Sequence, residues 1–205
     1  MTQGEDGRDR HASNDVCRLL IIGAGGHGRS VAEAVTAAGT YVVVGFADDA
    51  APGLVQVGSY PVLGTMDDVT AYRTHADAAI VAVGNNAMRE ALSNKLLAKG
   101  FKLVIVIHPR AIVSLSAIIG PGCAIMAGAI VGTEARLGSG VIVNCGAVVD
   151  HHAQVHDYGH LGVNACMAGG ADLGRNARMQ AGSALGYGVK VADGVVLQPG
   201  EAMSG

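Results

Sequence analysis

Residues 109–200 carry a six-residue repeat, which restricts the fold more than any other feature of the chain. Every sixth residue from Val113 to Leu197 is aliphatic or methionine, and the residue two places before each of them is small or β-branched. A helix repeats every 3.6 residues and a strand every two, so neither produces this spacing. A six-residue repeat instead predicts three short strands per coil, stacked as a parallel β-helix of about five coils.

The first half of the chain follows a different pattern, in which short apolar runs alternate with helical stretches. The runs that predict strands are residues 17–22, 41–46, 78–84 and 102–107. Helices are expected over 29–39 and 85–100, the second with Asn85 as its N-cap. This alternation predicts a small parallel α/β sheet. We therefore divide the chain into a disordered leader (1–15), a small Rossmann-like domain (16–108) and a β-helix domain (109–205).

Composition excludes several classes of protein. Half of the residues are hydrophobic and 15% are charged, so the chain can bury enough apolar surface to fold. Its net charge of −3 leaves no basic footprint for binding nucleic acid. No apolar stretch approaches the ~18 residues of a membrane span, and the start of the chain lacks the apolar segment of a signal peptide. The four cysteines show no CxxC spacing, so we expect reduced thiols and a soluble cytoplasmic protein.

The sequence GAGGHG at residues 23–28 fits the G-x-G-x-x-G template and lies between a predicted strand and a predicted helix. Alone it indicates a dinucleotide site, with Asp48 about 20 residues later as the ribose ligand. A helix N-terminus binds any pyrophosphate, however, including that of a nucleotide sugar. A sheet of about four strands is small for a dinucleotide. An NAD-dependent oxidoreductase and a plain tight turn stay open as alternatives.

Several segments, in this order, resemble one bacterial family. They are LLIIGAGGHGRSVAEAV, VVGFADD, PVLGTMDDV, AAIVAVGNN, VIHPRAIVS and, at residues 144–165, NCGAVVDHHAQVHDYGHLGVNA. Together with the repeat they resemble the nucleotide-sugar acetyltransferases of the hexapeptide-repeat acyltransferases, over residues 16–200. That family includes amino-sugar N-acetyltransferases of pilin and glycan pathways and sialic acid O-acetyltransferases. The resemblance implies a left-handed β-helix, a homotrimer with active sites between subunits, acetyl-CoA as co-substrate and a nucleotide sugar as acceptor.

The same resemblance assigns the candidate site residues. His151 is implied as the general base, with Asp150 as its acidic neighbour and Asn144 near the reacting group. Imidazole suits this role because its pKa is near neutrality. The residues implied to bind acetyl-CoA are His160, Gly169 and Ala181. Those implied to bind the acceptor are Gly25, Gly26, His27, Asp48, Asp49, Gly84 and Asn85.

One residue departs from the family pattern. Relatives often carry Glu or Asp directly after the catalytic histidine, whereas this chain has His152. Either Asp150 or Asp157 is then left to orient the base. His156 is interpreted as solvated.

The resulting hypothesis is an acetyl-CoA-dependent N-acetyltransferase, acting on a UDP- or GDP-linked amino-deoxy sugar in bacterial surface-glycan biosynthesis. O-acetylation of a sialic acid or related sugar, and a non-catalytic β-helix scaffold, remain alternatives. A zinc site like that of β-helix carbonic anhydrases would use His151 and His156, but Leu115 occupies the third ligand position, and a catalytic zinc needs three protein ligands. We therefore predict no metal. Cys145 is possible as an acyl nucleophile, although a packing role is favoured.

Overall fold

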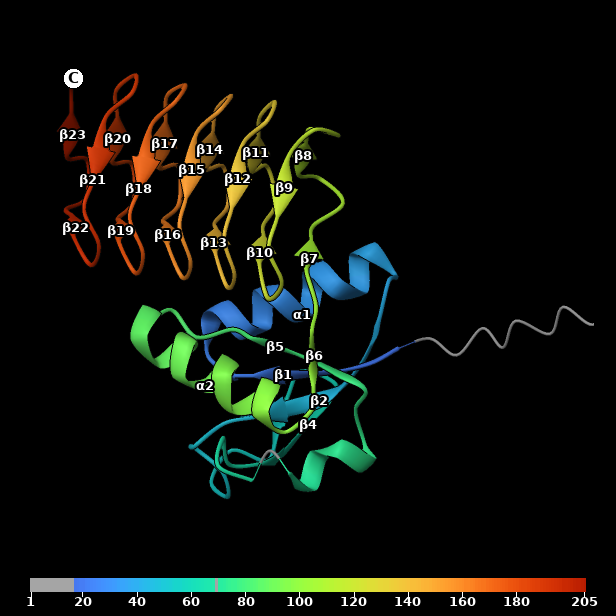
Figure 1. Cartoon of the computed structure of the whole chain (residues 1–205). Helices are drawn as coiled ribbons and strands as arrows, with labels where there is room; N and C mark the ends of the chain where they lie inside the picture. Colours follow the sequence, from blue (N-terminus) through green and yellow to red (C-terminus); the bar gives the residue numbers. More distant parts are fainter. Residues whose placement is uncertain (1–16, 69) are drawn as a thin grey trace, which may run out of the picture.

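The computed structural model of the chain describes residues 17–68 and 70–205. It contains an α/β domain and a β-helix, and the β-helix stands on one side of the α/β domain (Figure 1). The leader expected over residues 1–15 lies outside the described residues. No helix within the described ranges is long and apolar enough to cross a membrane.

The N-terminal domain is built on a six-stranded sheet with the order β3-β4-β2-β1-β5-β6. The strands are β1 (Arg18–Ile22), β2 (Val42–Ala47), β3 (Gln56–Val57), β4 (Tyr60–Gly64), β5 (Ala78–Val81) and β6 (Lys102–Leu103). All neighbours are parallel except β3 and β4. The four predicted runs each contain a strand of this sheet. The β3–β4 hairpin was not predicted, because β3 has only two residues and gives too short a pattern.

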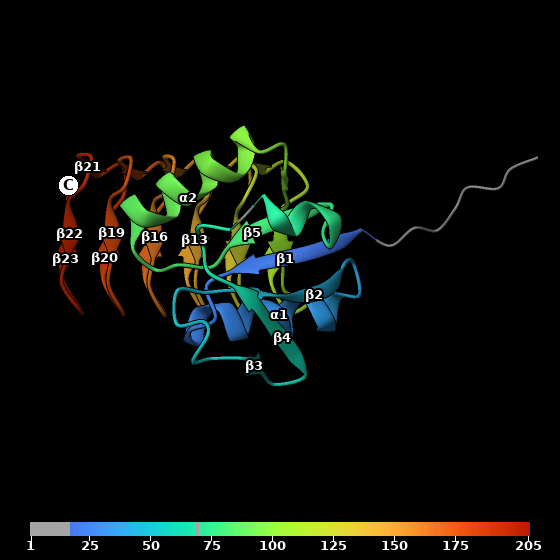
Figure 2. The same ribbon diagram turned by 90° about the horizontal axis from the view of Figure 1, so that it is seen from below.

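Two helices cover opposite faces of this sheet (Figure 2). Helix α1 (Gly26–Ala38) packs on the face of Leu19 and Ile21, and α2 (Asn86–Ala98) on the face of Leu20 and Ile22. A short 3₁₀ helix spans Ala71–Thr74. The predicted cap of α2 is confirmed, because the Asn85 side chain accepts a hydrogen bond from the Met88 amide at 2.9 Å.

The prediction of a single strand over residues 102–107 is wrong, because this run is divided between the two domains. Its first part is β6, which pairs with β5 in the N-terminal sheet. Its last part is β7 (Val106–Ile107), which pairs with β10 in the β-helix. The coils therefore begin a few residues before Pro109.

The second half of the chain forms seventeen two-residue strands, β7 to β23, in three parallel sheets. After β7 they are β8 (Ile112–Val113), β9 (Ile118–Ile119), β10 (Ala124–Ile125), β11 (Ile130–Val131), β12 (Arg136–Leu137), β13 (Ile142–Val143), β14 (Val148–Val149), β15 (Gln154–Val155), β16 (His160–Leu161), β17 (Cys166–Met167), β18 (Asp172–Leu173), β19 (Arg178–Met179), β20 (Ala184–Leu185), β21 (Lys190–Val191), β22 (Val196–Leu197) and β23 (Ala202–Met203). Each strand pairs with the strand 18 residues away, so one coil is three hexads. We name the sheets by their strands. Sheet C contains β7, β10, β13, β16, β19 and β22; sheet D contains β8, β11, β14, β17, β20 and β23; and sheet E contains β9, β12, β15, β18 and β21.

The repeat accounts for the core of the β-helix. From Ile125 to Leu197, every large residue of the hexad series is at most 5% exposed, and Val113 and Ile119 pack against the same cluster. The small residues of the second series fill the corners, apart from Val195, which is 40% exposed near the last coil. The predicted fold class, an α/β domain followed by a left-handed parallel β-helix, is confirmed.

Sheet C carries the N-terminal domain on its outer face. Val106, Ala124 and Met126 point outward from this sheet and share a buried cluster with Val31 and Val35 of α1. A triangular coil has one corner opposite each sheet. The corner between sheets D and E, which holds residues 150–153, is therefore the one farthest from the N-terminal domain.

Candidate active site

A cleft of about 300 Å³ opens at the carboxyl ends of β1, β2 and β5. The strand order reverses at β1, since β2 lies on one side and β5 on the other, and such switch points are where open α/β sheets bind ligands. Its lining residues are Gly23, Gly25, Gly26, His27, Asp48, Met66, Ala82, Val83, Gly84 and Met88. The structure thus brings five of the seven predicted acceptor residues to one cleft. Asn85 caps α2 beside it, and the exposed Asp49 accepts a hydrogen bond from the Met66 amide at 2.9 Å.

The glycine loop aims the N-terminus of α1 into this cleft. A Cβ atom at Gly28 would lie 1.9 Å from the Gly23 carbonyl oxygen, so only glycine allows the helix to approach the strand this closely. Gly25 is the N-cap and provides no side-chain cap. Amide groups of the first turn are therefore free to bind an anion such as a pyrophosphate.

Asp48 organises the loop from within. Its carboxylate accepts hydrogen bonds from the Ala24 amide at 2.7 Å and the Ala50 amide at 2.9 Å. Asp48 therefore holds the glycine loop to the end of β2, in addition to lining the cleft.

His160, which is buried, and His27, which is partly buried, lie where this cleft borders the β-helix. His160, on the outer face of sheet C, is 5% exposed, and its Nδ1 atom and the Nε2 atom of His27 are buried without a hydrogen-bond partner in the described structure. Burial lowers the pKa of His160 to about 3, reinforced by Arg89, Arg178 and His27, although a hydrogen bond to the Gly84 backbone acts in the opposite direction. Burial, with a smaller effect of Arg89, lowers the pKa of His27 to about 4. Both imidazoles are uncharged at neutral pH.

Arg89 is a residue that the sequence analysis missed. The residue is 1% exposed, and its guanidinium donates to the carbonyl groups of Val83 at 2.9 Å, Gly140 at 2.7 Å and Tyr158 at 2.7 Å. It thereby ties the loop after β5 to two coils of the β-helix. Burial lowers the pKa of Arg89 to about 10, so the group stays charged at neutral pH. Its spacing from buried Leu96, seven residues later, places it on the inward face of α2, and this was the available signal.

We expect acid to destabilise the protein through His27 and His160, whose pKa values are lowered. Well above pH 6.5 both imidazoles are neutral whether the chain is folded or unfolded. As the pH falls below 6.5, these imidazoles bind protons in the unfolded chain but stay neutral in the folded chain. The free energy of unfolding should therefore fall by about 2 kcal/mol per histidine between pH 7 and pH 5. Urea unfolding at both pH values, at one protein concentration, should show a smaller fall in His160→Asn. An equal fall in both proteins would contradict this assignment.

His151 lies at the corner between sheets D and E. Its backbone amide donates to Oδ1 of Asp150 at 2.7 Å, and its Nε2 atom is 3.9 Å from Oδ2 of the same residue. The ring occupies space that Gly169 leaves open on the next coil, because a Cβ there would lie 2.5 Å from the imidazole. Tyr187, two coils along, brings its ring centroid to 6.0 Å.

His152 contacts both His151 and Glu134. Its Nδ1 atom is 2.9 Å from Nδ1 of His151, and its Nε2 atom is 3.2 Å from Oε2 of Glu134. Glu134 and His152 occupy equivalent positions on successive coils, and both adopt the left-handed backbone conformation, with φ values of 56° and 59°. Asp157, the other predicted orienting acid, instead contacts the Ser139 amide and Arg175.

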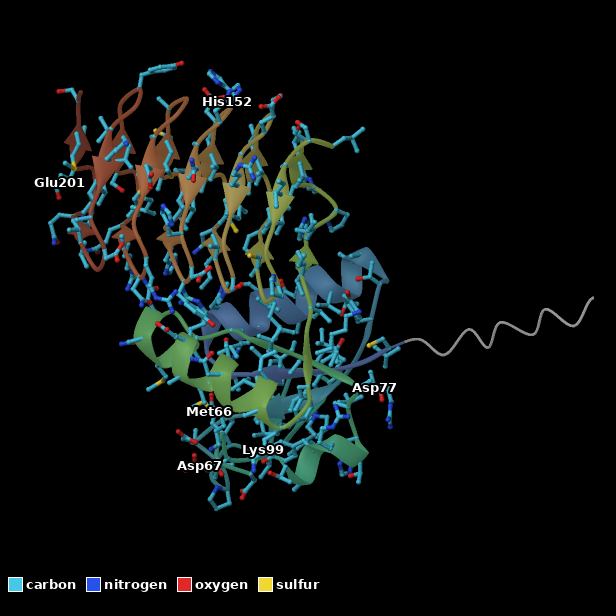
Figure 3. All side chains as sticks on the ribbon, in the orientation of Figure 1. Met66, Asp67, Asp77, Lys99, His152 and Glu201 are labelled. Carbon is cyan, nitrogen blue, oxygen red and sulfur yellow. The ribbon has the colours of Figure 1, made fainter. Side chains whose placement is uncertain are left out.

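Within one chain, His151 and the cleft lie on opposite sides of the β-helix. Figure 3 shows the neighbouring His152 at the edge farthest from the N-terminal domain. Of the residues predicted to bind acetyl-CoA, Gly169 lies beside His151, Ala181 lies at the corner between sheets C and D, and His160 lies at the domain interface. One chain therefore does not gather these residues into a single site.

The remaining candidates have local structural roles. Asn144 lies at the corner between sheets C and D and accepts a hydrogen bond from the Cys145 amide at 2.8 Å. Cys145 packs against the core of the N-terminal domain, which favours the packing role. His156 contacts Asp172 at 2.9 Å. Among residues 17–68 and 70–205, no group of three or more His, Cys, Asp or Glu side chains is arranged to hold a metal ion.

Comparisons with known proteins place this geometry among sugar acetyltransferases. Residues 18–96 match the family described as PglD N-terminal domain. The UDP-N-acetylbacillosamine N-acetyltransferase of Bacillus subtilis is 35% identical over 111 residues, which are 53% of this chain and 51% of that protein. The matching region therefore spans about half the length of that curated relative.

Solved structures match over nearly the whole chain. A perosamine N-acetyltransferase from Caulobacter crescentus, in complex with CoA and GDP-perosamine, is 32% identical, with 90% of each chain covered and a TM-score of 0.79. The acetyltransferase domain of PglB from Neisseria gonorrhoeae, in complex with acetyl coenzyme A, is 36% identical. That match covers 93% of this chain and 97% of the other, with a TM-score of 0.76.

Proposed function

The chain belongs to the hexapeptide-repeat nucleotide-sugar acetyltransferases, and we propose that it transfers the acetyl group of acetyl-CoA to the amine of a nucleotide-linked amino sugar. The family likeness over nine-tenths of the chain carries the proposal, since the relatives are structures bound to CoA and GDP-perosamine or to acetyl coenzyme A. We further propose a role in bacterial surface-glycan biosynthesis.

Each domain has a separate role in the proposed reaction. The domain over residues 16–108 binds the nucleotide sugar, with its pyrophosphate at the N-terminus of α1, where uncapped amides and Gly25 and Gly26 leave room. The β-helix, which begins at β7, binds acetyl-CoA and supplies the base. A nucleotide sugar fits the cleft, because a single phosphate-binding loop and a small sheet suffice to hold it.

The chemistry proposed for His151 follows from the charges involved. The sugar amine is largely protonated at neutral pH, so it must lose a proton before or during its attack on the thioester carbonyl carbon. One proton leaves the ammonium for solvent, and the neutral amine attacks; His151 takes a second proton from the nitrogen as the new C–N bond forms. The tetrahedral intermediate then collapses, the C–S bond breaks, and His151 returns the proton to the sulfur of the departing CoA.

The working unit is a homotrimer in which one chain supplies the acceptor cleft and a neighbour supplies His151. The positions of both groups on opposite sides of one β-helix support this arrangement. So does the outer face of sheet D, where Ile112 is 65% exposed, Ile130 is 37% exposed and the next residues in the column are Val148 and Cys166. A second copy would cover this apolar face.

The proposal is tested by assaying CoA release with acetyl-CoA and a panel of UDP- and GDP-linked amino sugars. We expect turnover with at least one amino sugar and none with the matching hydroxyl sugar, because the relatives are N-acetyltransferases. Mass spectrometry should place the added acetyl group on nitrogen. Transfer to a sialic acid hydroxyl would favour the O-acetyltransferase alternative, and inactivity with the whole panel would contradict the proposal.

Asp48→Ala provides the control for the acceptor cleft. Loss of the bonds to Ala24 and Ala50 should raise the KM for the nucleotide sugar several-fold and leave the KM for acetyl-CoA nearly unchanged. The opposite pattern would show that the cleft binds the acyl donor.

A further inference from the structure

His151, His152 and Glu134 form a chain of contacts, and the proton transfer proposed for His151 does not by itself require these contacts. Three side chains from two coils form one row: the two imidazole Nδ1 atoms are 2.9 Å apart, and the far nitrogen of His152 is 3.2 Å from the Glu134 carboxylate. The ring centroids are 5.2 Å apart with the two Nδ1 atoms between them, so the lone pair of one ring can face the N–H group of the other.

The hydrogen-bonding rules of imidazole fix the direction of this row. The Glu134 carboxylate lies 3.2 Å from Nε2 of His152 in an ion-pair contact and has no proton to donate, so it favours a proton on that nitrogen. A neutral His152 then has Nδ1 as an acceptor, and His151 donates its Nδ1–H to it. Nε2 of His151 is left without a proton, which is the form that a general base requires.

We propose that Glu134, acting through His152, is the positioning residue that sets the tautomer of His151 and stabilises its protonated form. This inference rests on the proposed function of His151. During transfer, Nε2 of His151 takes the proton from the amine, and the positive charge stays on His151. The carboxylate stabilises that charge through the intervening ring without receiving the proton.

Asp150 does not serve the same purpose. Its Oδ1 atom is engaged by the His151 backbone amide, and Oδ2 lies 3.9 Å from Nε2, the nitrogen that must face the substrate. The groups facing His151 are thus Asp150, His152 and, through the space over Gly169, the ring of Tyr187. Glu134 and His152 together supply the carboxylate that relatives carry directly after the catalytic histidine.

The experiment compares Glu134→Gln, His152→Gln and the double variant in the assay with the best amino sugar. Each single variant should lower kcat by roughly tenfold and change both KM values by less than about twofold. The double variant should be no slower than the slower single variant, because both substitutions break one path. The acidic limb of the kcat profile should move to lower pH, since protonated His151 loses a stabilising charge.

Two further variants separate this path from a structural effect. In His152→Glu the carboxylate stands directly beside His151, in a backbone conformation that Glu134 already adopts. Adding Glu134→Gln to it should therefore cost no further activity. Asp172→Asn, at the matched histidine–carboxylate pair with His156, should leave kcat and the pH limb unchanged.

Nitrogen-15 NMR of the histidine rings reports the tautomers of His151 and His152 without requiring turnover. It therefore tests this proposal even if the proposed function is wrong. In the wild type, we expect protons on Nδ1 of His151 and Nε2 of His152, and a mixture of tautomers in Glu134→Gln. The opposite tautomers in the wild type, or additive losses of kcat in the double variant, would overturn the proposal.

Discussion

Replacing His151 with alanine is expected to lower kcat by about 10²–10⁴-fold, the usual worth of a positioned general base. Binding of the nucleotide sugar should survive, because in the proposed site the cleft holds its pyrophosphate and His151 meets only the reacting amine. The fold should survive too, since the ring fills space left by Gly169 at the surface rather than a place in the core. The measurement is kcat at saturating acetyl-CoA, with calorimetric binding of the acceptor.

His156→Ala provides the matched control, because the side chains of His156 and His151 have similar exposures of 50% and 43% and His156 lies at a different corner of the β-helix. Its kcat should equal that of the wild type. If His151→Ala keeps more than about a tenth of the wild-type kcat while chemistry is rate-limiting, the amine loses its proton to another group, which contradicts the assignment. His152 would then be the next residue to replace, since it lies in contact with His151.

The parts of the fold that were predictable are those with a repeating local cause. Each hexad places one large residue inside the coil, so the repeat from Val113 to Leu197 predicts the β-helix almost position by position. The division of residues 102–107 between two sheets was not predictable in this way. The run is apolar after Lys102, and only the pairing of β7 with β10 shows where the second domain begins.

The same distinction applies to the candidate site, where a local motif was predictable and contacts between residues distant in the sequence were not. The glycine loop was found because its chemistry lies within six consecutive residues and a helix start. Arg89 was missed because its partners, Gly140 and Tyr158, lie 51 and 69 residues away. The row from Glu134 to His152 was missed although the spacing of 18 residues equals one coil of the repeat. Stacking brings such residues together, so the period of the repeat is a guide to contacts as well as to fold.

The shared site makes a second strong prediction, which concerns mixtures of two inactive variants. His151→Ala lacks the base, and Gly26→Glu places a carboxylate in the acceptor cleft, where a Cβ meets no atom within 4 Å. Each homotrimer should be nearly inactive, the second because the new charge repels the pyrophosphate of the acceptor. In trimers assembled at random from equal amounts of both chains, a site is intact when a Gly26→Glu chain supplies the base and a His151→Ala chain supplies the cleft. We therefore expect about a quarter of the wild-type rate.

The outcome depends on geometry alone, which makes the test decisive. If each chain contained its own complete site, every site in the mixture would lack one component and no activity would return. The two chains should carry different tags, so that mixed trimers can be isolated and their mass measured by light scattering. Isolated mixed trimers that remain inactive would refute the shared site, and a monomeric mass for the active wild-type enzyme would do the same. Recovery in the mixed trimers, and not in a mixture of separately assembled homotrimers, would place His151 of one chain opposite the cleft of its neighbour.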